Sequence, residues 1–270
     1  MARSSKPHMG SQHRIYVSLP ELTQQERAHS HEGADAVCTA LLSHGIGSGD
    51  VVFVSTFTHP RVAEAITRSG AEPIFVDVTL ETWHVSAEVL DIAAQWCLSV
   101  GSTPKALVMV DAYGLRFDSD ALREVCWKYD MAVIEDHLAS EGSARLTRPP
   151  VVVARRREIH ARYRRGLEGT PGVRFMPAVN SAAWNPWLTC VVFEEFDMRD
   201  RVMAALGDVA IECSYLWRPL HTVPAYADAT AIVDGTAEYL FEHGLRLPSS
   251  STLTDSRVDE VIETVVAVLG

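Results

Sequence analysis

Lysine is the residue type that is scarcest for the size of this protein. The 270-residue sequence has 24 basic residues, of which only three are lysines, at positions 6, 105 and 128, and the other 21 are arginines. Lysine amines are the groups that form Schiff bases with carbonyl compounds and cofactors. Any chemistry that depends on such an amine therefore has three candidates, and none of them follows Lys128.

The cysteines offer no recognisable framework of disulfides or metal ligands. The sequence contains five, an odd number, and they are scattered without CxxC spacing. This pattern is typical of free, buried thiols in a reducing cytosol, and it argues against zinc binding and against the disulfide scaffold of a secreted protein. The five positions are Cys38, Cys97, Cys126, Cys190 and Cys213.

The sequence has neither an excess of positive charge nor a long apolar run. The net charge is −11, whereas nucleic acids and anionic membranes attract clustered Lys and Arg. No stretch approaches ~20 uncharged apolar residues, and residues 1–12 are polar without a signal-peptide core. We therefore expect a cytoplasmic protein with no nucleic-acid or membrane partner, whose residues 1–12 are a disordered leader.

What is present is a regular alternation of strand and helix patterns. Apolar runs predict strands at 51–55, 73–77, 106–110 and 131–135, and amphipathic segments predict helices at 60–69, 86–97 and 118–129. Alternating β and α segments with nearly continuous Val, Ile and Phe strands indicate a parallel sheet covered by helices. We expect an α/β fold with four strands in the order 2-1-3-4, which places 73–77 and 131–135 at its edges.

A second unit follows a break in this pattern. Residues 140–150 have no core periodicity, and 151–167 form a predicted helix rich in arginine, which we interpret as a solvated face and not as an anion site. Thr254 is the predicted N-cap of the last helix, 254–269. The sequence thus predicts a large α/β domain at 13–150 and a small α+β domain at 151–270, whose other elements are strands 187–193, 210–215 and 245–248 and helices 198–206 and 232–242.

Polar side chains follow three of the predicted strands. His59 comes after the first, Asp111 and Tyr113 after the third, and Asp136 and His137 after the fourth. Ligand sites of such sheets lie at the carboxyl ends of the strands. Two imidazoles and two carboxylates suit general acid/base chemistry, and His59, Asp136 and His137 are also a possible metal-ligand set.

Structural roles remain open for these residues. In the structural alternative, His59 only begins the helix before Pro60, and His137 only satisfies a buried hydrogen bond. Tyr113 precedes Gly114 and fits a turn residue.

Several segments in order resemble the DegT/StrS-type sugar aminotransferases, which are pyridoxal-phosphate enzymes of fold type I. They are GIGSGD with VVFVSTFTHP, then GAEPIFVDV, VDAYG and VIED, and later IECSYLWRPLHTVPAY and LRLPSSSTLTD. The resemblance implies that Asp136 lies where the family aspartate pairs with the pyridine nitrogen, and His59 where an aromatic residue stacks on the cofactor ring. It also implies that Arg218 and His221 lie in a loop that approaches the active site, where they would bind a substrate anion or hydroxyls.

The chain departs from the family pattern where the cofactor is held. The family segment between VIED and the basic helix, which carries the Schiff-base lysine, is replaced here by the few residues 140–150. Glu32 and Asp35 stand where a small-residue turn cups the phosphate, and carboxylates compete with a dianion there. We assign Glu32 instead, with Tyr113, Arg218 and His221, to substrate binding. Ala139 stands where the family has Gln or His. We therefore predict that pyridoxal phosphate does not bind, and that a divalent metal is possible.

These departures predict a degenerate, pyridoxal-phosphate-independent pseudo-aminotransferase of natural-product biosynthesis. It would epimerise, dehydrate or cyclise a small sugar- or cyclitol-like metabolite through His59, Asp111, Asp136 and His137. The alternatives are a non-catalytic partner of an intact aminotransferase and a small-molecule binding protein, with residual transaminase activity placed last. Because strand 131–135 would have an apolar open edge, we expect a homodimer, a heterodimer with an aminotransferase-like protein, or coverage of that edge by residues 15–17 or the basic helix.

Overall fold

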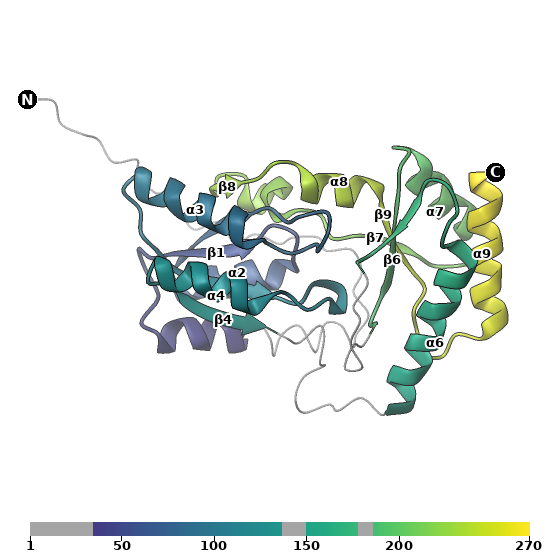
Figure 1. Cartoon of the computed structure of the whole chain (residues 1–270), viewed down its shortest axis with the longest axis horizontal. Coiled ribbons are helices and arrows are strands. Elements are labelled where there is room, and N and C mark those ends of the chain that lie inside the picture. The colour runs from purple at the N-terminus through teal and green to yellow at the C-terminus, as the bar shows by residue number, and fades with distance from the viewer. Residues whose placement is uncertain (1–34, 137–149, 178–185) are drawn as a thin grey trace, which may run out of the picture.

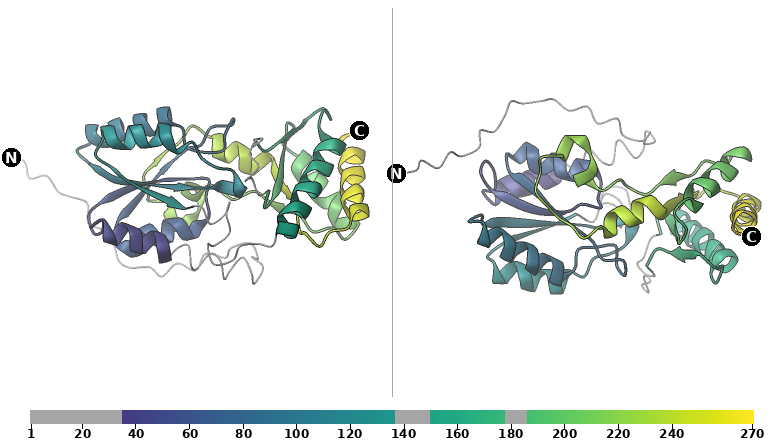
Figure 2. Two further views of the ribbon diagram at one scale, coloured as in Figure 1. Left: turned by 60° about the horizontal axis from the view of Figure 1, so that its bottom comes forward. Right: turned by 90° about the horizontal axis from the view of Figure 1, so that it is seen from above.

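The computed structural model describes residues 35–136, 150–177 and 186–270. The molecule has two parts, and each is built on its own sheet (Figure 1). A five-stranded parallel sheet with helices on both faces occupies one end. A four-stranded antiparallel sheet with the helices α6, α7 and α9 occupies the other (Figure 2).

The parallel sheet has the strand order β4-β3-β1-β2-β8. Its long strands are β1 (Val51–Ser55), β2 (Glu72–Val76), β3 (Pro104–Val110) and β4 (Ala132–Asp136). The predicted order of these four strands is confirmed, and each boundary lies within two residues of its prediction. Their apolar residues are buried because both faces of the sheet are covered.

The fifth strand corrects the prediction that the second strand is an edge. β8 (Ala231–Ile232) pairs with Phe75 and Val76 of β2, so a segment that was assigned to the small domain completes the sheet of the large one. Two residues are too few to show strand periodicity, and Ile232 was read as the start of a helix at 232–242. Helix α8 (Thr236–His243) begins only after this strand.

Two helix layers enclose the parallel sheet (Figure 2). A helix at residues 35–43 and α2 (Pro60–Ser69) pack on one face through Leu41, Ile66 and their neighbours. Helices α3 (Ala87–Ser99) and α4 (Ser119–Lys128) pack on the other face around Phe53 and Leu90. The amphipathic segments that predicted α2, α3 and α4 therefore do cover a parallel sheet.

The antiparallel sheet has the order β5-β6-β9-β7. Its strands are β5 (Val173–Phe175), β6 (Thr189–Phe193), β7 (Ser214–Tyr215) and β9 (Gly244–Leu247). Helices α6 (Pro150–Leu167), α7 (Met198–Asp208) and α9 (Asp255–Leu269) share its apolar core. The predicted N-cap is confirmed, since the Thr254 side chain accepts a hydrogen bond from the Arg257 backbone N–H. The strand expected at 210–215 is limited to its last two residues.

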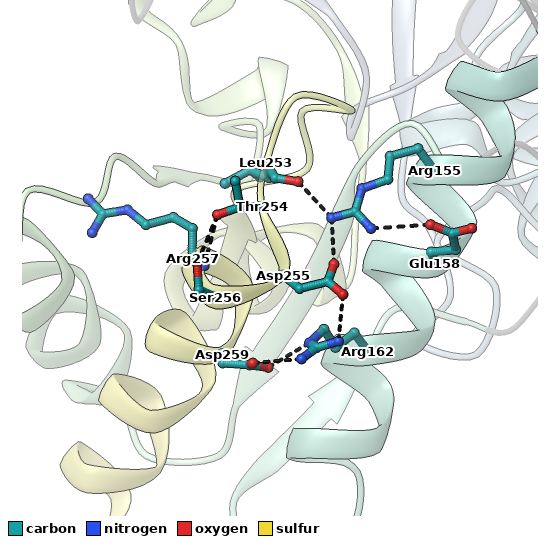
Figure 3. A network of polar contacts seen from close by, with 9 residues as sticks. All are labelled: Arg155, Glu158, Arg162, Leu253, Thr254, Asp255, Ser256, Arg257 and Asp259. Carbon is teal, nitrogen blue, oxygen red and sulfur yellow. Dashed lines mark hydrogen bonds and ion pairs between the residues drawn. The ribbon is translucent and has the colours of Figure 1, made fainter.

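The arginines of α6 are bound by acidic residues of α9 (Figure 3). Arg162 makes a two-pronged contact with Asp259, with both donor–acceptor distances at 2.6 Å, and a further contact of 3.0 Å with Asp255. Arg155 reaches Asp255 at 2.7 Å and the backbone carbonyl of Leu253 at 2.6 Å. These contacts hold the two helices together, so this part of the basic helix is neither fully solvated nor available as an anion site.

The edge of β4 is not covered by the basic helix, because α6 packs on α9 in the other part of the molecule. Among the described residues, β4 pairs with β3 alone. Residues 15–17, the other predicted cover, lie outside the described part of the chain. The prediction of a dimer thus stays a prediction.

Candidate functional site

The carboxyl ends of β1, β2 and β3 meet a fourth buried cluster, which joins the two sheets. The cluster includes Phe57 after β1, Tyr113 after β3, and Cys190 of β6. Trp217 and Leu216, from the loop after β7, close it from the side of the antiparallel sheet. The candidate site is therefore built where the two parts of the molecule meet.

His59 lies at the start of α2, directly beyond β1. Its Nδ1 atom accepts a hydrogen bond of 3.3 Å from the Arg61 backbone N–H, so the residue is the N-cap of the helix, with Pro60 as the first helical residue. Burial, together with the charges of Arg61 and Arg246, lowers the pKa of His59 to about 4. At neutral pH the ring is therefore uncharged, and it can stack on an aromatic surface without carrying a buried charge.

Trp217 links His59 to Tyr113. Its ring stacks on Tyr113 with centroids 4.2 Å apart, and His59 meets it edge-on at 5.9 Å. The Tyr113 hydroxyl also accepts a hydrogen bond of 2.6 Å from the Trp217 backbone N–H. Tyr113 is fully buried, and burial raises its pKa well above its ordinary value, so the hydroxyl stays protonated. Its φ of 55° places it in a tight left-handed turn, which agrees with a turn residue more than with a catalyst.

Asp111 and Asp136 lie at the ends of the neighbouring strands β3 and β4. The Asp111 backbone N–H donates to the Asp136 carbonyl over 3.1 Å, and this contact continues the ladder between the two strands. Asp111 is buried, and its charge acts on His84, whose ring nitrogen lies 3.1 Å from the Leu115 carbonyl oxygen. Two carboxylates thus lie beyond adjacent strands, as predicted.

His221 and Arg218 occupy different surroundings, although four positions or fewer separate both from Trp217. The two ring nitrogens of His221 lie 2.7 Å from the Thr56 hydroxyl and 2.7 Å from a Glu238 carboxylate oxygen. Arg218 is exposed, and its guanidinium lies over the Phe241 ring at 5.1 Å. His221 therefore fastens the loop to β1 and α8, whereas Arg218 stays accessible to a ligand.

Two predicted site residues, His137 and Glu32, lie outside the described residues. The proposed metal set of His59, Asp136 and His137 is therefore untested. Within the described ranges, no three His, Cys, Asp or Glu residues gather as metal ligands. All five cysteines, which the structure does describe, are free thiols, as predicted.

The structure adds residues that the pattern of strand ends did not single out. Trp217 lies in the segment IECSYLWRPLHTVPAY, which resembles the family, but nothing in its spacing showed that it stacks on Tyr113. Asp77 follows β2, and the same argument from strand ends could have found it. Thr58 is also buried beyond β1, and its hydroxyl has no hydrogen-bond partner among the described residues.

In the part of the chain that the structure describes, no helix is long and apolar enough to cross a membrane.

Comparison with known proteins places this site in context. The profile of the DegT/DnrJ/EryC1/StrS aminotransferase family matches residues 24–144 and 137–266. The putative pyridoxal phosphate-dependent aminotransferase EpsN of Bacillus subtilis (strain 168) is 26% identical over 312 residues, which cover 86% of this chain and 80% of that protein. The UDP-2-acetamido-2-deoxy-3-oxo-D-glucuronate aminotransferase of Pseudomonas aeruginosa is 29% identical over 143 residues, which cover 49% of this chain and 38% of that protein.

A solved structure supports the fold. The crystal structure of a DegT DnrJ EryC1 StrS aminotransferase from Brucella abortus matches with a TM-score of 0.78, at 21% sequence identity, over 88% of this chain and 84% of that one. The prediction of a fold type I aminotransferase-like α/β protein is confirmed.

These comparisons overturn the predicted chemistry. The relatives are named as pyridoxal-phosphate-dependent and sugar aminotransferases, so the prediction of a pyridoxal-phosphate-independent isomerase or lyase, a pseudo-aminotransferase, is wrong. The prediction of no cofactor is wrong for the same reason, because pyridoxal phosphate is the cofactor expected in this family. The prediction rested on three departures from the family pattern, namely the absent Schiff-base lysine, the carboxylates Glu32 and Asp35 at the phosphate turn, and Ala139. The family match over most of the chain outweighs them.

Proposed function

Because this chain belongs to the DegT/DnrJ/EryC1/StrS aminotransferase family, a family of enzymes, we propose that it acts in amino-sugar formation with pyridoxal phosphate as its cofactor. The proposed substrate is a nucleotide-linked keto-sugar, the class to which the name of the Pseudomonas relative refers. The observation that carries the proposal is that the contacting rings of His59 and Trp217 and the aspartates Asp111 and Asp136 all lie at the carboxyl ends of strands of the parallel sheet.

The residues that would hold the cofactor ring fit in type and position. Asp136 ends β4, where its carboxylate can pair with a protonated pyridine nitrogen. His59 is uncharged at neutral pH, and Trp217 adds an aromatic surface beside it, so both can lie against a flat ring. The buried Thr58 hydroxyl, which has no hydrogen-bond partner among the described residues, supplies a further polar group near the start of α2. When bound, the cofactor would supply the electron-accepting ring on which amino groups are exchanged.

The covalent anchor does not fit. None of the described lysines lies at the carboxyl ends of the strands, since Lys105 is in the first part of β3 and Lys128 is in the last turn of α4. The two arms of the family match, residues 24–144 and 137–266, leave little chain between the end of β4 and α6 for a further segment. We therefore assign binding and orientation to these residues, and derive no bond-making step that passes through the cofactor.

A single-turnover assay tests the proposed function. The protein at high concentration is mixed with pyridoxamine phosphate and a UDP-linked 3-keto sugar, and mass spectrometry follows the sugar. The expected product is the UDP-linked amino sugar, with one pyridoxal phosphate released for each amine transferred. The Asp136→Asn variant should form much less product, while Asp91→Asn, a surface carboxylate change on α3, should leave the yield unchanged. Absence of any amino sugar at saturating reagents would exclude the proposal.

A further inference from the structure

We infer that this chain holds its pyridoxal cofactor without a covalent bond, and that the aldehyde and amine forms of the cofactor therefore bind with similar affinity. The inference rests on the proposed function, and it concerns the manner in which the same site binds. It follows from where the amines of the chain lie and from which contacts remain at the strand ends.

Lys128 is held away from the site by an ion pair. Its Nζ atom donates to Asp91 over 2.6 Å, and the ammonium also lies 4.9 Å from the centre of the Tyr129 ring. The pair joins α3 and α4, and both side chains are partly exposed to solvent. Contact with Asp91 raises the pKa of Lys128, so the amine stays charged and is a poor nucleophile.

Lys105 lies at the opposite end of the sheet from the site. It is the second residue of β3, and it lines an open polar pocket of about 420 Å³ with Asp50, Asp130 and His44. Six residues separate it from Asp111, which corresponds to about 20 Å along an extended strand. A lysine side chain cannot bridge that length, and the strand between the two positions is buried on both sides.

Lys6 is the remaining amine, and it lies outside the described residues. The experiment below therefore treats it in the same way as the other two. No lysine follows position 128 in the sequence, so the loop that contains Trp217 and the strand that contains Arg246 contribute no amine.

The groups that remain at the site act equally on both forms of the cofactor. Pyridoxal phosphate and pyridoxamine phosphate share the ring, its nitrogen and the phosphate, and they differ only at the aldehyde or amine carbon. Asp136, His59 and Trp217 are suited to the shared parts. A Schiff base would form only if a lysine amine added to the aldehyde carbon and water left, and it would then favour the aldehyde form over the amine form.

Two measurements on the full chain test this inference. In the first, calorimetric titration gives the dissociation constants of pyridoxal phosphate and pyridoxamine phosphate. We expect the two constants to agree within about threefold, and Asp136→Asn to weaken both by a similar factor of about 10 to 100. Asp120→Asn, which changes an exposed carboxylate on α4, should change neither. A preference of more than about 100-fold for the aldehyde form would overturn the inference but leave the proposed function standing. Binding of neither form at millimolar concentration would overturn both.

In the second measurement, borohydride is added to the protein with pyridoxal phosphate, and intact mass is recorded. Hydride reduces a carbon–nitrogen double bond to a stable secondary amine, so a site-specific Schiff base leaves a permanent adduct. A Schiff base in the site would be suppressed by excess pyridoxamine phosphate, and we expect no adduct of this kind. Adducts that persist in excess pyridoxamine phosphate are background modification of surface amines and agree with the inference. A suppressible adduct near one per chain, lost in Lys6→Arg, Lys105→Arg or Lys128→Arg, would overturn it.

Discussion

Removing the Asp77 carboxylate should destabilise the junction between the two sheets more than any ordinary helix-cap change. Asp77 directly follows β2 and is 2% exposed. Its Oδ1 atom accepts hydrogen bonds from Val78 (2.8 Å) and Ala237 (2.9 Å), and its Oδ2 atom accepts from Asp234 and Gly235, both at 3.0 Å. One side chain therefore satisfies four backbone N–H groups, three of them at the start of α8.

The expected cost follows from the donors that are left without partners. A buried donor that loses its acceptor costs about 1–3 kcal/mol, and water can enter at the more exposed Asp234. We expect Asp77→Ala to lower the free energy of unfolding by about 3–5 kcal/mol, and Asp77→Asn by about 2–3 kcal/mol because one of its two terminal groups still accepts. A matched control is Asp118→Ala, since Asp118 caps α4 through a single exposed contact of 3.5 Å to Ala121 and should cost under about 1 kcal/mol.

Urea denaturation followed by circular dichroism measures these differences. The effect should reach the site, because α8 carries Glu238, the partner of His221. If Asp77→Ala and Asp118→Ala lose the same stability, the claim that Asp77 holds α8 against the parallel sheet is refuted.

Three further outcomes follow from the structure. Gly244→Ala should lower the free energy of unfolding by more than about 2 kcal/mol, because an added Cβ would lie 2.5 Å from the Leu240 carbonyl oxygen. In the control Gly207→Ala the added Cβ meets nothing within 4 Å, and the change should stabilise the helix by about 0.5 kcal/mol. Equal unfolding curves for the two variants would contradict this packing. Burial lowers the pKa of His59 and of His84 to about 4, below the usual 6.5. Each ring therefore contributes stability that is present above about pH 6.5 and is lost as the pH falls toward 4, by up to about 3 kcal/mol each. A melting temperature that stays constant from pH 7 to 4.5 would show that these rings are not buried and neutral. Light scattering should show a dimer, because no described residue pairs with the outer edge of β4. A monomer whose β4 amides exchange slowly with deuterium would contradict this prediction.

The long elements of this fold could be predicted because their patterns are local. Strands such as β1 and β3 are continuous apolar runs, and α2 starts at a proline and ends at Gly70, whose φ is 92°. β8 could not be predicted in the same way, because two residues have no period and their pairing with β2 depends on contacts across more than 150 residues of sequence. The same limit applies to strand 210–215, of which only the last two residues pair.

The site was predictable in outline and not in detail. The argument from strand ends correctly placed Asp111 and Asp136 beside each other, since the carboxyl ends of parallel strands share one edge. It did not show that Trp217 stacks on Tyr113, because that contact joins two sheets whose relative position is set by packing. The cofactor was misjudged because the missing lysine, the carboxylates Glu32 and Asp35 and the replacement Ala139 were given more weight than the remaining family pattern.

The central claim is that a pyridoxal cofactor binds at the carboxyl ends of β1, β3 and β4. A crystal structure of the protein grown with pyridoxamine phosphate tests it most directly. The account predicts the ring beside His59 and Trp217, with its nitrogen within hydrogen-bonding distance of the Asp136 carboxylate. Cofactor bound only in the polar pocket beside Lys105, or none bound at saturating concentration, would contradict it.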